Sequence, residues 1–219
     1  MNRQNELIAA LSRDLKPVNA LPNLNVLAVI WLLASAGFVV AMTHLVAPIR
    51  PGSFGQLISN PRFLVESLLG LLAIAWIGLT AFRESIPAAL TRPFAVIGCI
   101  LMILWLAQYV IGLISPALEP SILGKRAHCL EETMIYALPP IVAAVMIMRR
   151  LYPLRFVRTA MIFGLAAGML PALYMQFACM YEAKHILSFH VLPGLAMVLV
   201  AGAIAAVWKH RVESFRNFR

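Results

Sequence analysis

Apolar residues are grouped along the chain into six long blocks separated by shorter polar connections. The blocks cover residues 24–46, 63–82, 93–115, 131–148, 158–179 and 189–208. Each is close to the length of about 20 apolar residues that a helix needs to cross the hydrocarbon core of a bilayer. The pattern therefore predicts an all-α integral membrane protein, in which residues 24–208 form a bundle of six transmembrane helices.

Residues 1–23 precede the first block and are mostly polar, but a short amphipathic helix is predicted within them. Asn5 is a suitable N-cap, and Pro17 ends the helical pattern. The apolar side chains of the segment recur at helical spacing and share one face: Leu7, Ile8, Leu11 and Leu15. A helix of about ten residues is marginal in isolation, so this helix needs a partner. The mixed charge around it favours a protein over a lipid surface.

Composition supports the membrane prediction and excludes two other classes of protein. Hydrophobic residues make up 62% of the chain and charged residues 12%, and the mean hydropathy is +0.86. A soluble domain carries about 25% charged residues, and a disordered chain has low hydrophobicity. Most of the surface must therefore lie in membrane lipid.

The net charge of +9 comes from 18 Lys and Arg against 9 Asp and Glu. Thirteen of the 18 lie in the two terminal segments and in the second and fourth connections, which a six-span chain places on one side. The positive-inside rule assigns that side to the cytoplasm. Both termini are thus predicted to be cytoplasmic, with residues 209–219 as a basic tail, and direct nucleic-acid binding is not needed to explain the charge.

Two cysteines fall on the predicted outer side, at the ends of two different spans. Cys129 and Cys179 lie at one membrane level, where an oxidising compartment allows a disulfide. As thiolates they can instead bind a soft or transition metal ion. Free cysteines are also often small buried hydrophobic residues, so the pattern leaves three interpretations open.

Other potential metal ligands lie near these cysteines in the sequence. His128 and Glu132 are four residues apart, so a helix starting there presents them together beside Cys129. Further candidates follow Cys179 in the last outer connection and at the start of the sixth span: His185 and His190. Separated Cys and His residues are a weaker signal than a CxxC repeat.

The spans themselves show a packing signal. Small residues recur every four positions on the fifth span: Ala160, Gly164, Gly168 and Ala172. Such a stripe lets two helices approach closely. We expect a structural contact there.

Two other functions are compatible with six spans. A transporter needs polar residues along a path, yet no charge lies at the centre of any span. A membrane redox protein needs a reactive Cys pair with a quinone or haem, yet the chain has no CxxC, and His44 and His190 lie near the surface.

Five stretches resemble, in order, the NrsF-type family of bacterial anti-sigma factors, which are six-span inner-membrane proteins. They are LIAALSRDLKPV at 7–18, NPRFLVESLLGLLAIAWIGLTAFRESIP at 60–87, CLEETMIYALPP at 129–140, AAGMLPALYMQFAC at 166–179 and FHVLPGL at 189–195. Each stretch is weakly specific, and the ordered set covers nearly the whole chain.

The resemblance implies a regulator rather than an enzyme. It implies that the N-terminal segment holds an extracytoplasmic-function sigma factor, and it places the contact on Leu7, Ile8, Leu11, Arg13, Asp14 and Leu15. It also implies that Cys129 and Cys179 sense metal or oxidative stress, with a metal ion as a signal rather than a resident cofactor. Release would then follow from movement of the fourth and fifth spans.

Overall fold

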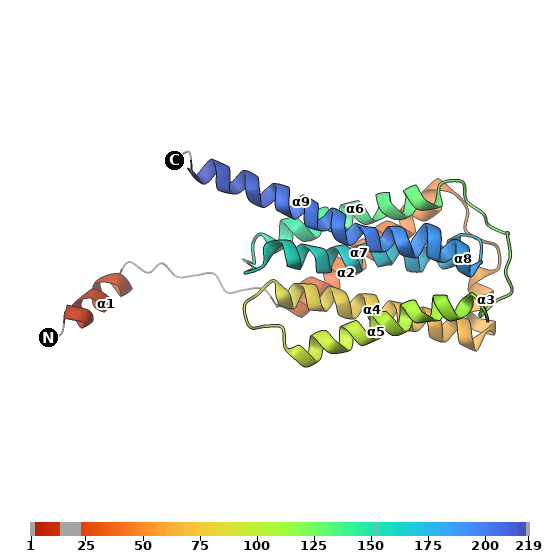
Figure 1. The fold of residues 1–219 in the computed structure, drawn as a ribbon, viewed down its shortest axis with the longest axis horizontal. Coiled ribbons are helices and arrows are strands. Elements are labelled where there is room, and N and C mark those ends of the chain that lie inside the picture. Colours follow the sequence, from red (N-terminus) through yellow and green to blue (C-terminus); the bar gives the residue numbers. More distant parts are fainter. Residues whose placement is uncertain (1–2, 14–22, 152, 218–219) are drawn as a thin grey trace.

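The computed structural model describes residues 3–13, 23–151 and 153–217, and the side chains of these residues up to 211. Within that part of the chain every regular element is a helix, as predicted (Figure 1). The helices are α1 (Arg3–Arg13), α2 (Leu24–Val46), α3 (Ser53–Ser59), α4 (Pro61–Glu84), α5 (Arg92–Gly112), α6 (Cys129–Met148), α7 (Phe156–Ala178), α8 (Ala183–Ile186), the π-helical turn η1 (Leu187–Val191) and α9 (Leu192–Asn217).

Six helices in the described residues are long and apolar enough to cross a membrane, which confirms the predicted number. They are α2, α4, α5, α6, α7 and the continuous run Ala183–Arg211. The last run begins before residue 189 because α8 and η1 join α9 without a break. The sequence did not predict α3, whose seven residues are too few to give a clear period.

The bundle is built around α7. Of its most apolar window 67% is buried, against 22% for α5. The helices α2, α4, α6 and α9 all contact α7. A helix that is apolar on every side and surrounded by others belongs to the core. By contrast, α5 packs mainly against α4 and leaves a wide apolar face toward lipid.

The closest contact in the bundle is between α7 and α9, on the predicted stripe of small residues. Gly164 lies against Met197 and Ala201, and Gly168 lies against the backbone of Gly194. A Cβ atom on Gly168 would overlap the Gly194 carbonyl oxygen. The structural interpretation of the stripe is therefore confirmed.

Gly168→Ala is expected to destabilise the bundle by about 1–3 kcal/mol, because overpacking forces the two backbones apart. Gly37→Ala is the matched control, since a Cβ there meets nothing within 4 Å. The control gains helix propensity and should be neutral or slightly stabilising. Thermal unfolding of both variants in detergent measures the difference, and equal midpoints would contradict the packing argument.

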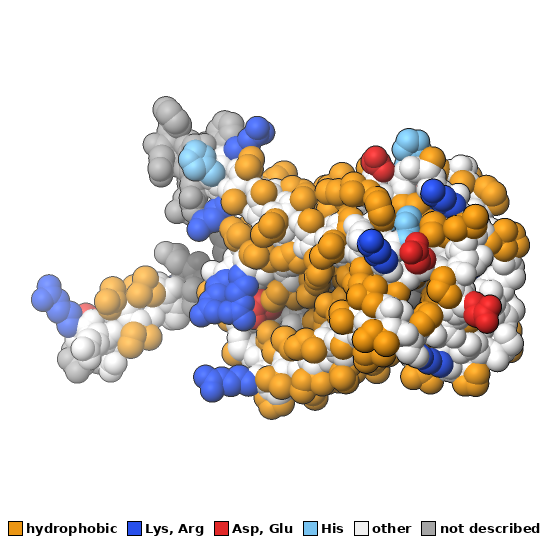
Figure 2. Space-filling view, turned by 45° about the vertical axis from the view of Figure 1, so that its right-hand side comes forward, with side chains coloured by type: hydrophobic (Ala, Val, Ile, Leu, Met, Phe, Trp, Pro, Cys, Tyr) orange, Lys and Arg blue, Asp and Glu red, His pale blue; other side chains and the backbone are white. Residues whose placement is uncertain are grey.

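The first turn of α2 and the last turns of α9 lie at the same end of the bundle (Figure 1). We call this the basic end, because Lys and Arg side chains gather there (Figure 2). The opposite end carries α3 and α8, and we call it the α3 end. Assigning the basic end to the cytoplasm is the prediction of the positive-inside rule.

A helix forms in the N-terminal segment from Arg3 to Arg13, so it begins two residues before the predicted cap Asn5, and none of its residues is buried. The apolar side chains of Leu7, Ile8 and Leu11 are 60–63% exposed. Two other residues predicted to contact a partner, Asp14 and Leu15, lie outside the described residues. At the other terminus, α9 continues into the predicted tail and ends at Asn217.

Candidate metal centre

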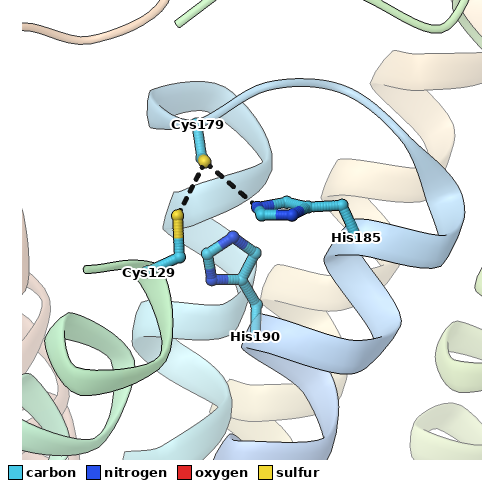
Figure 3. Close-up of side chains that lie close together, drawn as sticks. All are labelled: Cys129, Cys179, His185 and His190. Atoms are coloured by element: carbon cyan, nitrogen blue, oxygen red, sulfur yellow. Dashed lines mark hydrogen bonds between the residues drawn. The ribbon is translucent and has the colours of Figure 1, made fainter. Parts of the chain in front are cut away.

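Four potential metal ligands converge at the α3 end of the bundle: Cys129, Cys179, His185 and His190 (Figure 3). Their donor atoms all lie within 4.8 Å of one another. Both cysteines and His190 are buried, and His185 is half-buried. Together with Met180 the cysteines form a small apolar cluster apart from the main core.

Each ligand comes from a different element. Cys129 begins α6, and Cys179 follows the last residue of α7, where its backbone N–H donates to the Met175 carbonyl at 2.8 Å. His185 lies in α8 and His190 in η1. A change at this site therefore affects four elements at once.

The π-helical turn η1 explains how both histidines reach the site. Residues five apart on an α-helix point about 140° apart, since each residue turns by roughly 100°. In a π-helix the hydrogen bond runs from i to i+5, so such residues stack on one side. The rings of His185 and His190 accordingly lie 5.2 Å apart, centroid to centroid.

Pro193 accounts for the position of this turn. It has no N–H, so the carbonyl of Phe189 one turn earlier loses its α-helical donor. The Thr133 hydroxyl of α6 lies 3.4 Å from that carbonyl, although its closer acceptor is the Cys129 carbonyl at 2.8 Å. The freed carbonyl therefore faces a polar group of the neighbouring helix α6.

The two sulfurs lie 3.1 Å apart, and both cysteines are free thiols. The hydrogen bond between them lowers the pKa of the Cys179 thiol below its ordinary value, although burial opposes that shift. The Cys179 sulfur also lies 3.4 Å from Nε2 of His185. Cys179 thus contacts both Cys129 and His185, and its lowered pKa favours the thiolate, which is the form that binds metal ions.

His190 is held in the orientation of a metal ligand. Its Nδ1 lies 3.0 Å from the Thr133 hydroxyl, whereas its Nε2 is buried with no hydrogen-bond partner. Metal-binding histidines usually use the other ring nitrogen in a hydrogen bond that fixes the ring. A buried polar atom left without a partner is costly, and a metal ion at the site would satisfy Nε2.

The donor set matches the chemistry of a borderline or soft metal ion. Two thiolates and two imidazoles are the four-coordinate set of many structural Zn²⁺ sites. Thiolates also select soft ions over Mg²⁺ or Ca²⁺, which prefer oxygen. These residues therefore fit Zn²⁺ or a similar thiophilic divalent ion.

Two residues that the sequence offered as ligands do not join the four-residue group. Glu132 forms a buried ion pair with Arg126, with a Nε–Oε2 distance of 2.7 Å. His128 is exposed at the N-cap of α6. At the end of α2, His44 is bonded to the Tyr174 hydroxyl at 2.8 Å.

Comparison with known proteins identifies one similarity. A family model described as negative regulator of sigma F matches residues 11–211, which is nearly the whole chain. The match includes every helix from α2 to α8, η1, and all four ligands of the candidate metal centre. No curated protein and no solved structure matches the chain.

Proposed function

The chain belongs to the NrsF family of negative regulators of sigma F, and from that premise we propose that it is an inner-membrane anti-sigma factor. In this proposal, both termini face the cytoplasm, and the N-terminal segment sequesters an extracytoplasmic-function sigma factor. The match over residues 11–211 is the observation that carries the proposal. The six apolar helices support the membrane location.

The exposed apolar face of α1 supports its role as the sigma-binding element. Leu7, Ile8 and Leu11 are more than half exposed, although they share one side of a helix. Isolated apolar faces of this kind are typical of segments that dock into a groove of another protein. Arg13 ends the helix and adds a charged contact.

The four-residue group at the α3 end supports a sensor of metal stress. A metal ion there would bind Cys129 and Cys179, with His185 and His190 completing the set. Drawing four ligands toward one ion favours one arrangement of α6, α7, α8 and η1. A ligand shifts a protein between two states only by binding one state better, and this site provides such a preference.

Oxidation of the same two thiols is the second input that the geometry favours. The sulfurs already lie 3.1 Å apart. An external two-electron oxidant would convert the thiols to a disulfide, with loss of two protons and two electrons. Metal binding and disulfide formation would both move the same helix ends, so the same conformational change could follow from either signal.

A solute path receives less support from the bundle interior. The polar side chains buried between α4, α5 and α7 bond one another: Tyr109 donates to Gln176, which donates to Ser67, each at 2.9 Å. Such bonds between helices stabilise packing in a membrane. They leave these groups occupied rather than available to a passing solute.

Co-purification tests the proposed function directly. The full chain, tagged and solubilised in detergent from its own membranes, should retain a sigma factor that mass spectrometry identifies. Adding Zn²⁺ or a thiol oxidant should elute that sigma factor. Absence of any sigma factor under mild conditions would contradict the proposal.

Thr133→Val is expected to weaken metal binding roughly 10–100-fold, because the hydrogen bond to a metal-binding histidine orients the ring. Thr159→Val is the matched control: Thr159 is buried and bonds the Arg155 carbonyl, at the basic end. Competition with a chromophoric chelator measures both affinities. Equal affinities would show that Thr133 does not orient a ligand.

A further inference from the structure

The guanidinium of Arg126 connects three parts of the α3 end, although Arg126 itself lies in the connection before α6. Its side chain is 2% exposed. Nη1 donates to the carbonyls of Ala47 and Pro48 at 3.0 and 3.2 Å, and Nη2 donates to Thr43 at 3.1 Å. The remaining N–H, on Nε, donates to the Glu132 carboxylate at 2.7 Å.

These acceptors lie at or just beyond the end of α2. The last carbonyls of a helix have no partner within it, and they carry the negative end of the helix dipole. A planar guanidinium with several N–H groups in a fixed fork fits such a set of carbonyls. Arg126 is therefore the C-terminal cap of α2, supplied from a distant part of the chain.

The backbone of the same residue contacts the candidate metal centre. The Cys129 thiol donates to the Arg126 carbonyl, with an Sγ–O distance of 3.4 Å. Glu132, which holds the guanidinium, lies one turn further along α6. Arg126 thus touches the sensor with its carbonyl and α2 with its side chain.

We propose that Arg126 couples the metal site to α2, and through α2 to the N-terminal segment. The inference rests on the proposed function. A metal ion held by Cys129 would draw its sulfur toward the other three ligands and away from the Arg126 carbonyl. The turn 126–129 then rearranges around the ion and carries the guanidinium with it. The cap on α2 loosens, and α2 moves relative to α6.

The position of α2 makes this route direct. Residues 1–23 lead into α2, so a change in its tilt or axial position acts on the segment that holds the sigma factor. The route proposed from the sequence, through α6 and α7 alone, reaches the basic end in the connection after Met148. It then needs a further contact to reach α1.

The chain offers a matched control at the same end. Arg62 pairs with Glu66 at 2.9 Å and also donates to Ser115. Like Arg126 with Glu132, this is an Arg–Glu ion pair, and it lies next to α3. Arg62 bonds Glu66 and Ser115 rather than α2 or Cys129. Arg62→Gln removes an ion pair without removing the cap on α2.

The test compares Arg126→Gln, Arg126→Lys and Arg62→Gln in the full-length protein. Hydrogen exchange of the amides in residues 43–48 is measured with and without Zn²⁺, together with Zn²⁺ affinity and sigma release. We expect Zn²⁺ to change the exchange in the wild type and in Arg62→Gln. Both Arg126 variants should bind Zn²⁺ yet lose the exchange response, and release should fall about tenfold or more, within the roughly 5–150-fold range of allosteric couplings.

Arg126→Lys keeps a cation beside Glu132 but cannot span three carbonyls, so it carries the test if Arg126→Gln does not fold. Wild-type exchange responses in the Arg126 variants would overturn the coupling. So would an equal loss in Arg62→Gln, or no exchange response to Zn²⁺ in the wild type. A clear exchange response without any sigma release would leave the coupling intact and contradict the proposed function instead.

Discussion

Serine in place of both Cys129 and Cys179 is expected to leave sigma binding intact while abolishing metal-induced release. A serine hydroxyl stays protonated at neutral pH and is a poor ligand for soft ions, whereas thiolates select them. The two sulfurs are half of the four-ligand group. The loss of metal affinity should therefore exceed the roughly 10–100-fold that loss of an outer hydrogen-bond partner costs.

Cys99→Ser is the control for this pair. Cys99 is a free thiol on the exposed face of α5 and does not belong to the group. Expression from a sigma-dependent promoter, with and without added Zn²⁺ or oxidant, reports release. The Cys129 and Cys179 variants should repress as the wild type does but fail to induce, and Cys99→Ser should induce normally. Induction that persists in the double variant would remove the cysteines as sensors.

The single variants separate the two inputs. A disulfide needs both sulfurs, so either serine should abolish the oxidant response completely. Metal binding can retain three ligands after one substitution, and a residual response at higher Zn²⁺ concentration is expected. Cys179 contacts both Cys129 and His185, so its loss should be the more severe.

The sequence predicted the bundle well because its signals are local and strong. Six apolar blocks fix six spans, since each block is long enough alone. The stripe through Gly164 and Gly168 predicted a close helix contact for the same reason. By contrast, α3 and the π-helical turn depend on contacts made after the helices pack. The local hydrophobic periodicity of the sequence therefore does not indicate them.

The candidate site was only partly predictable. Helical spacing grouped His128 and Glu132 with Cys129, but in the structure Glu132 forms an ion pair with Arg126. The two histidines that do join the cysteines are five residues apart, a spacing that an α-helix would separate. Pro193 was the available signal, because a proline in a helix frees the carbonyl one turn earlier.

Arg126 shows a further limit of reading charge from sequence. Counted as one of the basic residues on the outer side, it contributed only to orientation. In the structure it is a buried cap with four partners. Which carbonyls a guanidinium reaches depends on tertiary packing, and the sequence near Arg126 contains none of them.

Aspartate at both Leu7 and Leu11 is expected to abolish sequestration and give constitutive sigma activity. Full burial of each leucine in a partner is worth about 1.5–3 kcal/mol. Loss of both should therefore weaken binding by about 100-fold or more, at roughly 1.4 kcal/mol per tenfold. Both side chains lie on α1 and are 60% and 63% exposed. The double substitution therefore removes no packing contact between these leucines and the bundle.

The control places the same two charges on the other side of the helix. Asn5→Asp with Ala9→Asp adds two aspartates to α1, about 110–150° from the centre of the apolar face at roughly 100° per residue. The added charge is then the same in both variants, and the apolar contact is lost only in the first. Reporter expression without stress, and retention of the sigma factor on the detergent-solubilised protein, measure both variants. Because the bundle and its metal site are unchanged, Zn²⁺ affinity should stay at the wild-type value in each. Repression by the Leu7 and Leu11 variant equal to that of the control would place the sigma-binding surface elsewhere. The connections at the basic end would then be the next candidates.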